Sequence, residues 1–191
     1  MSGRIPRVIT HEEEVVLLQH LKRNSIRNYT LALFGLKMGL RAGEIIALDV
    51  SDVFHAGQVF HEIEIRSATT KTKKPRWGYI APELHLALDQ LIKKKRSNGQ
   101  SLNPQDPLFC SSWANKRLGI RRLQQIIRSA AENTLGCRLK PHDLRHTFAT
   151  NMMRKANARV VQELLGHASI KTTQLYTHPN RQDLKQAYET L

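Results

Sequence analysis

A histidine and an arginine in the segment 141–147, PHDLRHT, have the types and spacing that phosphate chemistry requires. His142 and Arg145 are three residues apart, so on a helix they share one side, and Pro141 suits the start of that helix. The planar guanidinium of arginine binds two phosphate oxygens at once and stabilises the charge that develops on them. An amphipathic helix with histidines at its edge would show the same pattern, so this segment alone leaves both interpretations open.

A second arginine and a tyrosine could take part in the same chemistry. Arg41 stands between two glycines at an expected helix junction, in the segment 39–45, GLRAGEI. His167 lies in the segment 165–178, and Tyr176 comes nine residues after it. A tyrosine hydroxyl has a pKa of about 10, so it attacks phosphorus only with a base or cations nearby. Taken singly, a surface arginine and a half-buried tyrosine would explain these residues as well.

Cations are concentrated at the expected tip of a hairpin, in the segment 69–76, TTKTKKPR. A lysine there could reach into a groove and donate a proton. A solvated run of charge explains most of these cations equally well.

A metal-dependent mechanism finds less support. The acidic residues are scattered, whereas metal-activated hydrolysis of a phosphodiester needs clustered carboxylates or His and Cys ligands. His142 and His146 are four residues apart, as in zinc-binding helices, but no glutamate follows His142 directly as in the HExxH motif. We therefore expect no metal ion and no other cofactor.

The net charge of the chain points to a polyanionic partner. Thirty Lys and Arg residues against sixteen Asp and Glu residues give +14, with an isoelectric point near 10.2. Nucleic acid is the usual partner of so basic a domain. Residues 61–130 carry fourteen basic and five acidic residues, a net charge of +9, so we expect this part of the chain to supply the main phosphate-facing surface.

Length and composition indicate one folded domain. The 191 residues are 40% hydrophobic, enough for a sizeable core, and contain no apolar run of about 18 residues that would span a membrane. The first seven residues lack the apolar run of a secretory signal. Two cysteines, Cys110 and Cys137, are too few for a disulfide framework, so we expect a reducing compartment and a cytoplasmic, DNA-associated protein.

The patterning predicts a mostly helical α+β domain with one small antiparallel sheet. Thr10 and Glu13 fit a capping box that starts the first helix, whose apolar face is Val15, Leu18 and Leu21. Alternation over 62–66, paired with 77–80, predicts a hairpin. A second helix, with core candidates Leu31, Phe34 and Met38, is expected to end at Gly39. The expected helices after the first are 26–38, 43–48, 82–95, 120–132, 142–155, 158–165, 170–176 and 181–189.

In their joint order, these segments resemble the catalytic domain of the tyrosine recombinase (phage integrase) family. The resemblance covers about residues 10–190 and rests mainly on HDLRHTFAT and LGHASIKTTQLYTH. It implies that Tyr176 is the nucleophile and that Lys71, with Lys73 as the alternative, is the hairpin lysine. Glu44 would support the first arginine. The remaining catalytic positions that the resemblance implies are Arg41, His142, Arg145 and His167.

The resemblance also implies a mechanism. Tyr176 would attack a DNA phosphodiester, His142 would accept its proton, and Lys71 would protonate the leaving 5′-oxygen. The product would be a 3′-phosphotyrosyl intermediate that a second strand resolves by religation, without metal or ATP. Two alternatives stay open: a type IB topoisomerase-like DNA relaxase and a non-catalytic DNA-binding module with the same fold.

The expected organisation is an N-terminal extension over residues 1–9 and a catalytic domain over residues 10–191. The N-terminal core-binding domain that usually accompanies this domain is expected to be absent. The expected partner is double-stranded DNA, with 93–96 and 121–122 as backbone-contacting cations. Self-association as a tetramer on DNA would use the tail helix 181–189.

Overall fold

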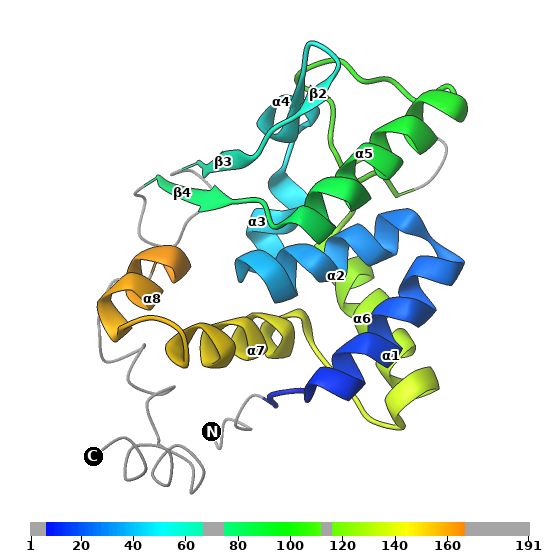
Figure 1. The fold of residues 1–191 in the computed structure, drawn as a ribbon. Helices are drawn as coiled ribbons and strands as arrows, with labels where there is room; N and C mark the ends of the chain where they lie inside the picture. Colours follow the sequence, from blue (N-terminus) through cyan, green and yellow to red (C-terminus); the bar gives the residue numbers. More distant parts are fainter. Residues whose placement is uncertain (1–6, 67–74, 112–115, 167–191) are drawn as a thin grey trace, which may run out of the picture.

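The computed structural model of the chain describes residues 7–66, 75–111 and 116–166 (Figure 1). The described part is mostly helical, as the sequence predicts. Its elements in chain order are α1 (His11–Asn24), α2 (Ile26–Met38), α3 (Ala42–Ala47), α4 (Val50–Val53), β1 (Phe54–His55), β2 (Gln58–Val59), β3 (Glu62–Ile65), β4 (Arg76–Tyr79), α5 (Pro82–Ser97), α6 (Ile120–Leu135), α7 (Pro141–Met153) and α8 (Ala158–Leu165).

The boundaries of the first two helices follow from their capping residues. The side chain of Thr10 accepts a hydrogen bond from the Glu13 backbone N–H (3.3 Å), and the Thr10 N–H donates to the Glu13 carboxylate (3.0 Å). This reciprocal pair is the predicted capping box. α2 ends at Gly39, whose φ of +63° lies in the left-handed region that glycine adopts without strain. Both predictions are confirmed.

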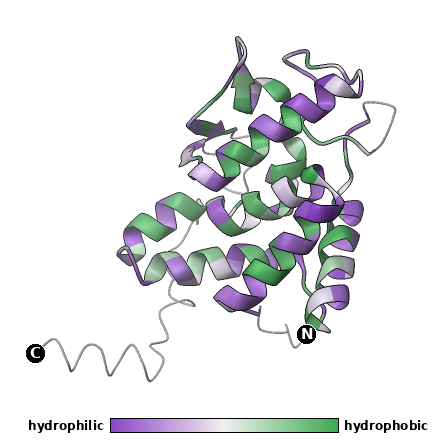
Figure 2. Cartoon of the chain, turned by 45° about the vertical axis from the view of Figure 1, so that its right-hand side comes forward, coloured by the Kyte–Doolittle hydropathy of each residue, from purple (hydrophilic) through white to green (hydrophobic). Residues whose placement is uncertain are grey.

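α2 is the central helix of the domain. It contacts α1, α5, α6 and α7, and nine of its thirteen residues are buried, including the predicted core residues Leu31, Phe34 and Met38. Phe34 packs edge-to-face against Phe109, with ring centroids 5.9 Å apart. Each such fully buried apolar side chain contributes about 1.5–3 kcal/mol through removal from water. In Figure 2 the surrounding helices alternate between hydrophobic and hydrophilic faces, as helices packed around such a core do.

The buried face of α1 differs from the predicted one. Leu18 and Leu21 are buried as expected, but Val15 is exposed and Leu17 takes its place in the core. The buried face runs through Glu14, because the Lys37 ammonium donates to its carboxylate at 2.6 Å and compensates the charge. A charged residue, Glu14, therefore lies on the buried face of α1, at a position that the apolar periodicity of the sequence does not predict to be buried.

The strands form two separate two-stranded antiparallel sheets, and the predicted small sheet is one of them. β3 pairs with β4 as expected, with Ile63 opposite Gly78 and Ile65 opposite Arg76. The second pair, β1 with β2, was missed, because two residues a strand are too short to show alternation. α4 was missed for the same reason, since it is a single turn.

Several predicted helices match the structure closely, namely those over 82–95, 120–132, 142–155 and 158–165, which correspond to α5, α6, α7 and α8. The predicted helices 170–176 and 181–189 lie outside the described residues. Among the helices that are described, none is long and apolar enough to cross a membrane.

Candidate active site

The turn from α2 into α3 places Arg41 at the edge of the core. Gly39 reverses the chain, Leu40 is buried, and Arg41 is the extended residue that precedes α3. The Arg41 backbone N–H donates to the Glu44 carboxylate at 2.8 Å, which satisfies one of the N–H groups that a helix start leaves without an intrahelical partner. The RAGE segment thus holds the arginine and the glutamate three residues apart on the same turn.

The first turns of α7 place His142 and Arg145 in different environments. Pro141 occupies the first turn, as predicted, and Asp143 accepts hydrogen bonds from the Lys140 N–H (2.7 Å) and the Arg7 N–H (3.0 Å). His142 is consequently exposed, while Arg145 points into the core and is 1% exposed. The same Asp143 contact holds residue 7, within the segment 1–9 expected as an extension, against α7.

The carboxyl end of α8 provides three consecutive backbone carbonyls that each accept a hydrogen bond from a different arginine. α8 starts at Asn157, whose side chain caps the first turn, and ends at Gly166 with φ +60°. The three contacts are Arg76 Nε to Leu164 O (3.1 Å), Arg145 Nη2 to Leu165 O (2.7 Å) and Arg41 Nη2 to Gly166 O (3.4 Å). Cations suit this position, because the last carbonyls of a helix carry a partial negative charge.

The buried carboxylate of Glu44 faces the same three guanidinium groups. Arg76 binds it with two hydrogen bonds (2.9 and 2.8 Å), Arg41 Nη1 donates at 2.9 Å, and Arg145 Nη1 lies 3.8 Å away. Burial alone would raise the pKa of Glu44, but the hydrogen bonds and charges of Arg76 and Arg41 outweigh it and lower the pKa below its ordinary value. We call Arg41, Arg76, Arg145 and Glu44 the arginine cluster.

The three guanidinium groups differ in their access to solvent. The Arg145 side chain is 2% exposed, and its Nη1 also donates to the carbonyl of Gly39 at 2.5 Å. The Arg76 side chain is 8% exposed, whereas that of Arg41 is 27% exposed. Arg41 is therefore the member of the cluster that an incoming anion meets first.

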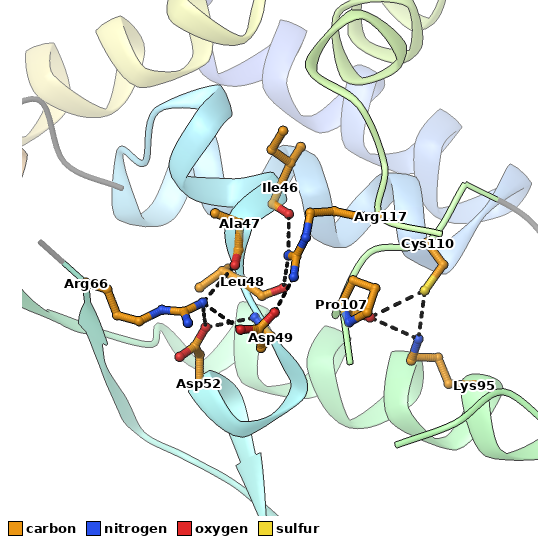
Figure 3. A network of polar contacts seen from close by, with 10 residues as sticks. All are labelled: Ile46, Ala47, Leu48, Asp49, Asp52, Arg66, Lys95, Pro107, Cys110 and Arg117. Atoms are coloured by element: carbon orange, nitrogen blue, oxygen red, sulfur yellow. Dashed lines mark hydrogen bonds and ion pairs between the residues drawn. The ribbon is translucent and has the colours of Figure 1, made fainter. Parts of the chain in front are cut away.

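Arginines also fix both described ends of the β3–β4 hairpin. Arg76 begins β4 and joins it to Glu44 and α8. Arg66, directly after β3, donates to Ala47 O (2.8 Å) and to the carboxylates of Asp52 (2.8 Å) and Asp49 (2.9 Å) (Figure 3). The segment 67–74, which contains both candidate lysines, thus leaves and rejoins the described structure beside α3.

A second arginine approaches the same turn from the opposite side in Figure 3. Arg117 donates to Ile46 O (2.8 Å) and Leu48 O (3.1 Å) and also forms an ion pair with Asp49. Together with Arg66 it holds the end of α3, so the helix that presents Glu44 is restrained at both ends.

The environment of His142 favours its neutral form. Loss of solvation lowers its pKa, and the positive charges of Arg145, Arg41 and Lys140 lower it further against the opposing effect of Asp143. A neutral imidazole is a proton acceptor, so the exposed ring of His142 is suited to general-base chemistry near neutral pH.

The structure therefore brings three of the predicted site residues together: Arg41, Arg145 and His142. Lys71, Lys73, His167 and Tyr176 lie outside the described residues. The sequence places Arg76 in a run of cations that looks solvated, but in the structure its side chain is 8% exposed and pairs with Glu44. The local sequence signals at Arg76 are the proline before it and the strand pattern after it, and neither indicates that the arginine side chain is buried.

One of the cations predicted to contact DNA is also buried. Lys95, in the run 93–96, is 3% exposed, so it does not share the exposed surface of its neighbours. Its position on α5 follows the apolar stripe of Leu88, Leu91 and Ile92, which turns it inward. The described residues contain no group of three or more His, Cys, Asp or Glu side chains arranged to hold a metal ion.

Comparisons with known proteins agree with this geometry. Residues 7–183 match the phage integrase family. The tyrosine recombinase XerC of Pseudomonas fluorescens is 31% identical over 191 residues, covering 98% of this chain and 60% of the relative. The chain therefore spans about three fifths of the length of that relative.

Solved structures give the same result. The crystal structure of XerA recombinase is similar with a TM-score of 0.81 and 30% identity, over 98% of this chain and 66% of the other. A post-cleavage complex of the XerH site-specific recombinase with its palindromic difH substrate is similar with a TM-score of 0.76 and 26% identity, over 97% and 53% of the two chains.

Proposed function

The chain belongs to the phage integrase family, and from that premise we propose that it breaks and rejoins DNA at a specific sequence through a phosphotyrosyl intermediate. The Tyr176 hydroxyl oxygen attacks the phosphorus, and its proton passes to His142. The bond from phosphorus to the 5′-oxygen breaks, and Lys71 donates a proton to that oxygen. The products are a 3′-phosphotyrosyl bond and a 5′-hydroxyl, and attack by the hydroxyl of a second strand reverses the step.

The arginine cluster is the observation that carries this proposal. Three guanidinium groups meet one buried carboxylate, which leaves a net positive charge next to the partly exposed Arg41. Such fixed cations stabilise the charge of a phosphorane in place of a metal ion. Glu44 and the end of α8 already hold these groups before DNA binds, so we expect the rearrangement to accompany DNA binding and the chemical step itself to need little more.

Each described residue has a distinct part in the proposed mechanism. Arg41 binds the scissile phosphate, and His142 accepts the tyrosine proton. Because Arg145 is 1% exposed, its guanidinium reaches the phosphate only after its surroundings rearrange, so we expect DNA binding to open this part of the site. His167, which follows the end of α8, donates a further hydrogen bond to the same phosphate.

The proposed assembly is a tetramer on double-stranded DNA, joined through the tail 181–189, with residues 10–191 as the catalytic unit. The XerH structure supports DNA as the substrate, since that related recombinase is bound to its DNA site after cleavage. The basic charge of the chain supports it independently.

Covalent capture tests the proposal. The full chain is incubated, in EDTA, with nicked duplexes whose central sequence is randomised, and protein–DNA adducts that survive SDS are recovered and sequenced. We expect an adduct that Tyr176→Phe abolishes without loss of DNA binding, and enrichment of one sequence among the captured duplexes.

Other outcomes separate the alternatives. Adducts without joined products between two duplexes, together with relaxation of supercoiled plasmid, would indicate a topoisomerase-like relaxase. Binding without any adduct on the enriched sequence would indicate a non-catalytic DNA-binding module and would refute the enzymatic proposal.

A further inference from the structure

A second concentration of cations lies away from the arginine cluster, around a cavity of about 450 Å3. The cavity is bounded by the turn between α1 and α2, the carboxyl end of α5, and residues 108 and 110. In Figure 1 these elements lie on the opposite side of the molecule from α8. Five cationic side chains line the cavity, and no Asp or Glu is among its lining residues: the cations are Lys22, Arg23, Arg27, Lys94 and Lys95. We call this the cationic cavity.

Lys95 is the deepest of these cations and lacks an acidic partner among the described residues. Its Nζ lies 3.4 Å from the carbonyl oxygen of Pro107 and 3.4 Å from the sulfur of Cys110 (Figure 3). The residue is 3% exposed. Burying an ammonium group is unfavourable unless an opposite charge compensates it, and two neutral groups at this distance provide only weak compensation.

Arg27 adds a second, partly buried charge to the same wall. Its Nη1 donates to the carbonyl of Cys110 at 2.7 Å, and its Nε donates to the side chain of Asn28 at 3.1 Å. Burial lowers the pKa of Arg27, and the positive charge of Arg122 lowers it further. The guanidinium therefore stands in a cationic surrounding with only neutral acceptors.

The side chains of the three remaining cations can turn toward a ligand that is bound in the cavity. Lys22, Arg23 and Lys94 are exposed, and within the described structure none of them forms an ion pair. Lys22 lies over the ring of Tyr29, 5.4 Å from its centroid. Neutral donors complete the lining, from the side chains of Asn24, Asn98 and Gln100. The lining of the cationic cavity therefore offers many hydrogen-bond donors and a large positive charge to a single ligand.

We infer that the cationic cavity binds phosphate groups. A phosphate brings up to two negative charges and several acceptor oxygens, so one group can meet Lys95 and Arg27 together. The phosphate can come from a free oligophosphate or from the backbone of bound DNA. Only the second source rests on the proposed recombinase function.

Binding of tripolyphosphate to the full chain, measured by titration calorimetry, tests the inference. The cavity variant is Lys22→Gln/Lys94→Gln, whose exposed positions leave the core intact. The control variant, Arg154→Gln/Lys155→Gln, also removes two exposed cations but none from the cavity lining. We expect the cavity variant to bind about tenfold more weakly or worse, and the control to bind like the wild type.

The salt dependence of binding to duplex DNA distinguishes the two sources. If DNA phosphates occupy the cavity, the slope of log K against log salt becomes less steep in the cavity variant, by up to about 1.8, since each lost phosphate contact contributes about 0.9. An unchanged slope with weaker tripolyphosphate binding assigns the cavity to free oligophosphates.

Two results would overturn the inference: no measurable tripolyphosphate binding by the wild type, or equal affinity in the wild type and the cavity variant. Neither result affects formation of the Tyr176 adduct. Conversely, if the adduct assay fails, tripolyphosphate binding still tests whether the cavity binds phosphate.

Discussion

The arginine cluster and the cationic cavity both remove positive side chains from water, and they compensate the charge differently. In the cluster, three guanidinium groups share the buried carboxylate of Glu44 and the last carbonyls of α8. In the cavity, Lys95 and Arg27 have only neutral acceptors among the described residues. The comparison indicates that the fold itself supplies the anion that compensates the cluster, whereas in the inference drawn above the anion for the cavity comes from a ligand.

Removal of the shared carboxylate is expected to have the largest effect. Glu44→Gln leaves three cations around a neutral side chain and should lower the free energy of unfolding by about 3–5 kcal/mol, as breaking a buried ion pair does. Denaturant unfolding measures the loss. Glu132→Gln is the matched control, because Glu132 also accepts from two arginines, Arg128 and Arg138, but at the surface. A comparable loss in both variants would contradict the distinction.

Distortion of the backbone at Gly39 should disturb the cluster next most strongly. A Cβ at Gly39 would lie 2.4 Å from an atom of the Phe148 ring, at a φ of +63°. Gly39→Ala should therefore cost about 2–4 kcal/mol of unfolding free energy, from overpacking and from left-handed strain together.

Gly99 provides the control for Gly39 at the cationic cavity. It has a similar φ of +66°, but a Cβ there meets no atom within 4 Å. Gly99→Ala should thus lose only the strain, about 1–2 kcal/mol. Equal losses in the two alanine variants, measured by thermal unfolding, would show that packing around Gly39 contributes nothing.

A substitution at Lys95 should have the opposite sign. Lys95→Met removes a buried charge that no acidic group balances, so the variant should be as stable as the wild type or about 0–2 kcal/mol more stable in phosphate-free buffer. Tripolyphosphate should then narrow the difference, because it stabilises the wild type more than the variant. Thermal unfolding with and without tripolyphosphate measures both effects. A clear loss of stability in phosphate-free buffer would mean that the protein itself compensates the buried charge of Lys95.

The smallest expected effect is the influence of the cluster on His142. Arg41→Gln removes one of the charges that lower the pKa of this histidine, so its pKa should rise toward the ordinary value. The imidazole would then be protonated at a higher pH. Nuclear magnetic resonance titration of His142 gives the pKa directly. An unchanged pKa would mean that the charge of Arg41 does not act on His142.

Local sequence signals were enough to predict most of the helices. Thr10 and Glu13 mark the start of α1, Gly39 marks the end of α2, and Pro141 marks the start of α7. These residues act within their own turn, so their effect is visible without knowledge of the tertiary fold. The β1–β2 pair and the single turn of α4 carry no comparable signal, because neither is long enough to show a period.

The environment of the cations could not be predicted in the same way. Arg76 and Lys95 each stand in a run of basic residues that looks solvated, yet the side chain of Arg76 is 8% exposed and Lys95 is buried. Arg76 owes its burial to Glu44, 32 residues earlier, and to Leu164, 88 residues later. The types and spacing of Arg41, His142 and Arg145 were visible in the sequence. The carboxylate and the carbonyls that hold the arginines become evident only from tertiary contacts.

Two backbone carbonyls accept hydrogen bonds from the two ends of the Arg145 guanidinium, beside the ion pair with Glu44. They belong to Gly39 and Leu165, at the carboxyl ends of α2 and α8. A carbonyl oxygen is common to every residue type, so position 165 can change its side chain and still bind the arginine while the helix ends in the same place. Among homologous sequences, this contact would therefore leave no trace of paired substitutions. It would be detectable instead through insertions and deletions, which would be excluded wherever they shift the end of either helix.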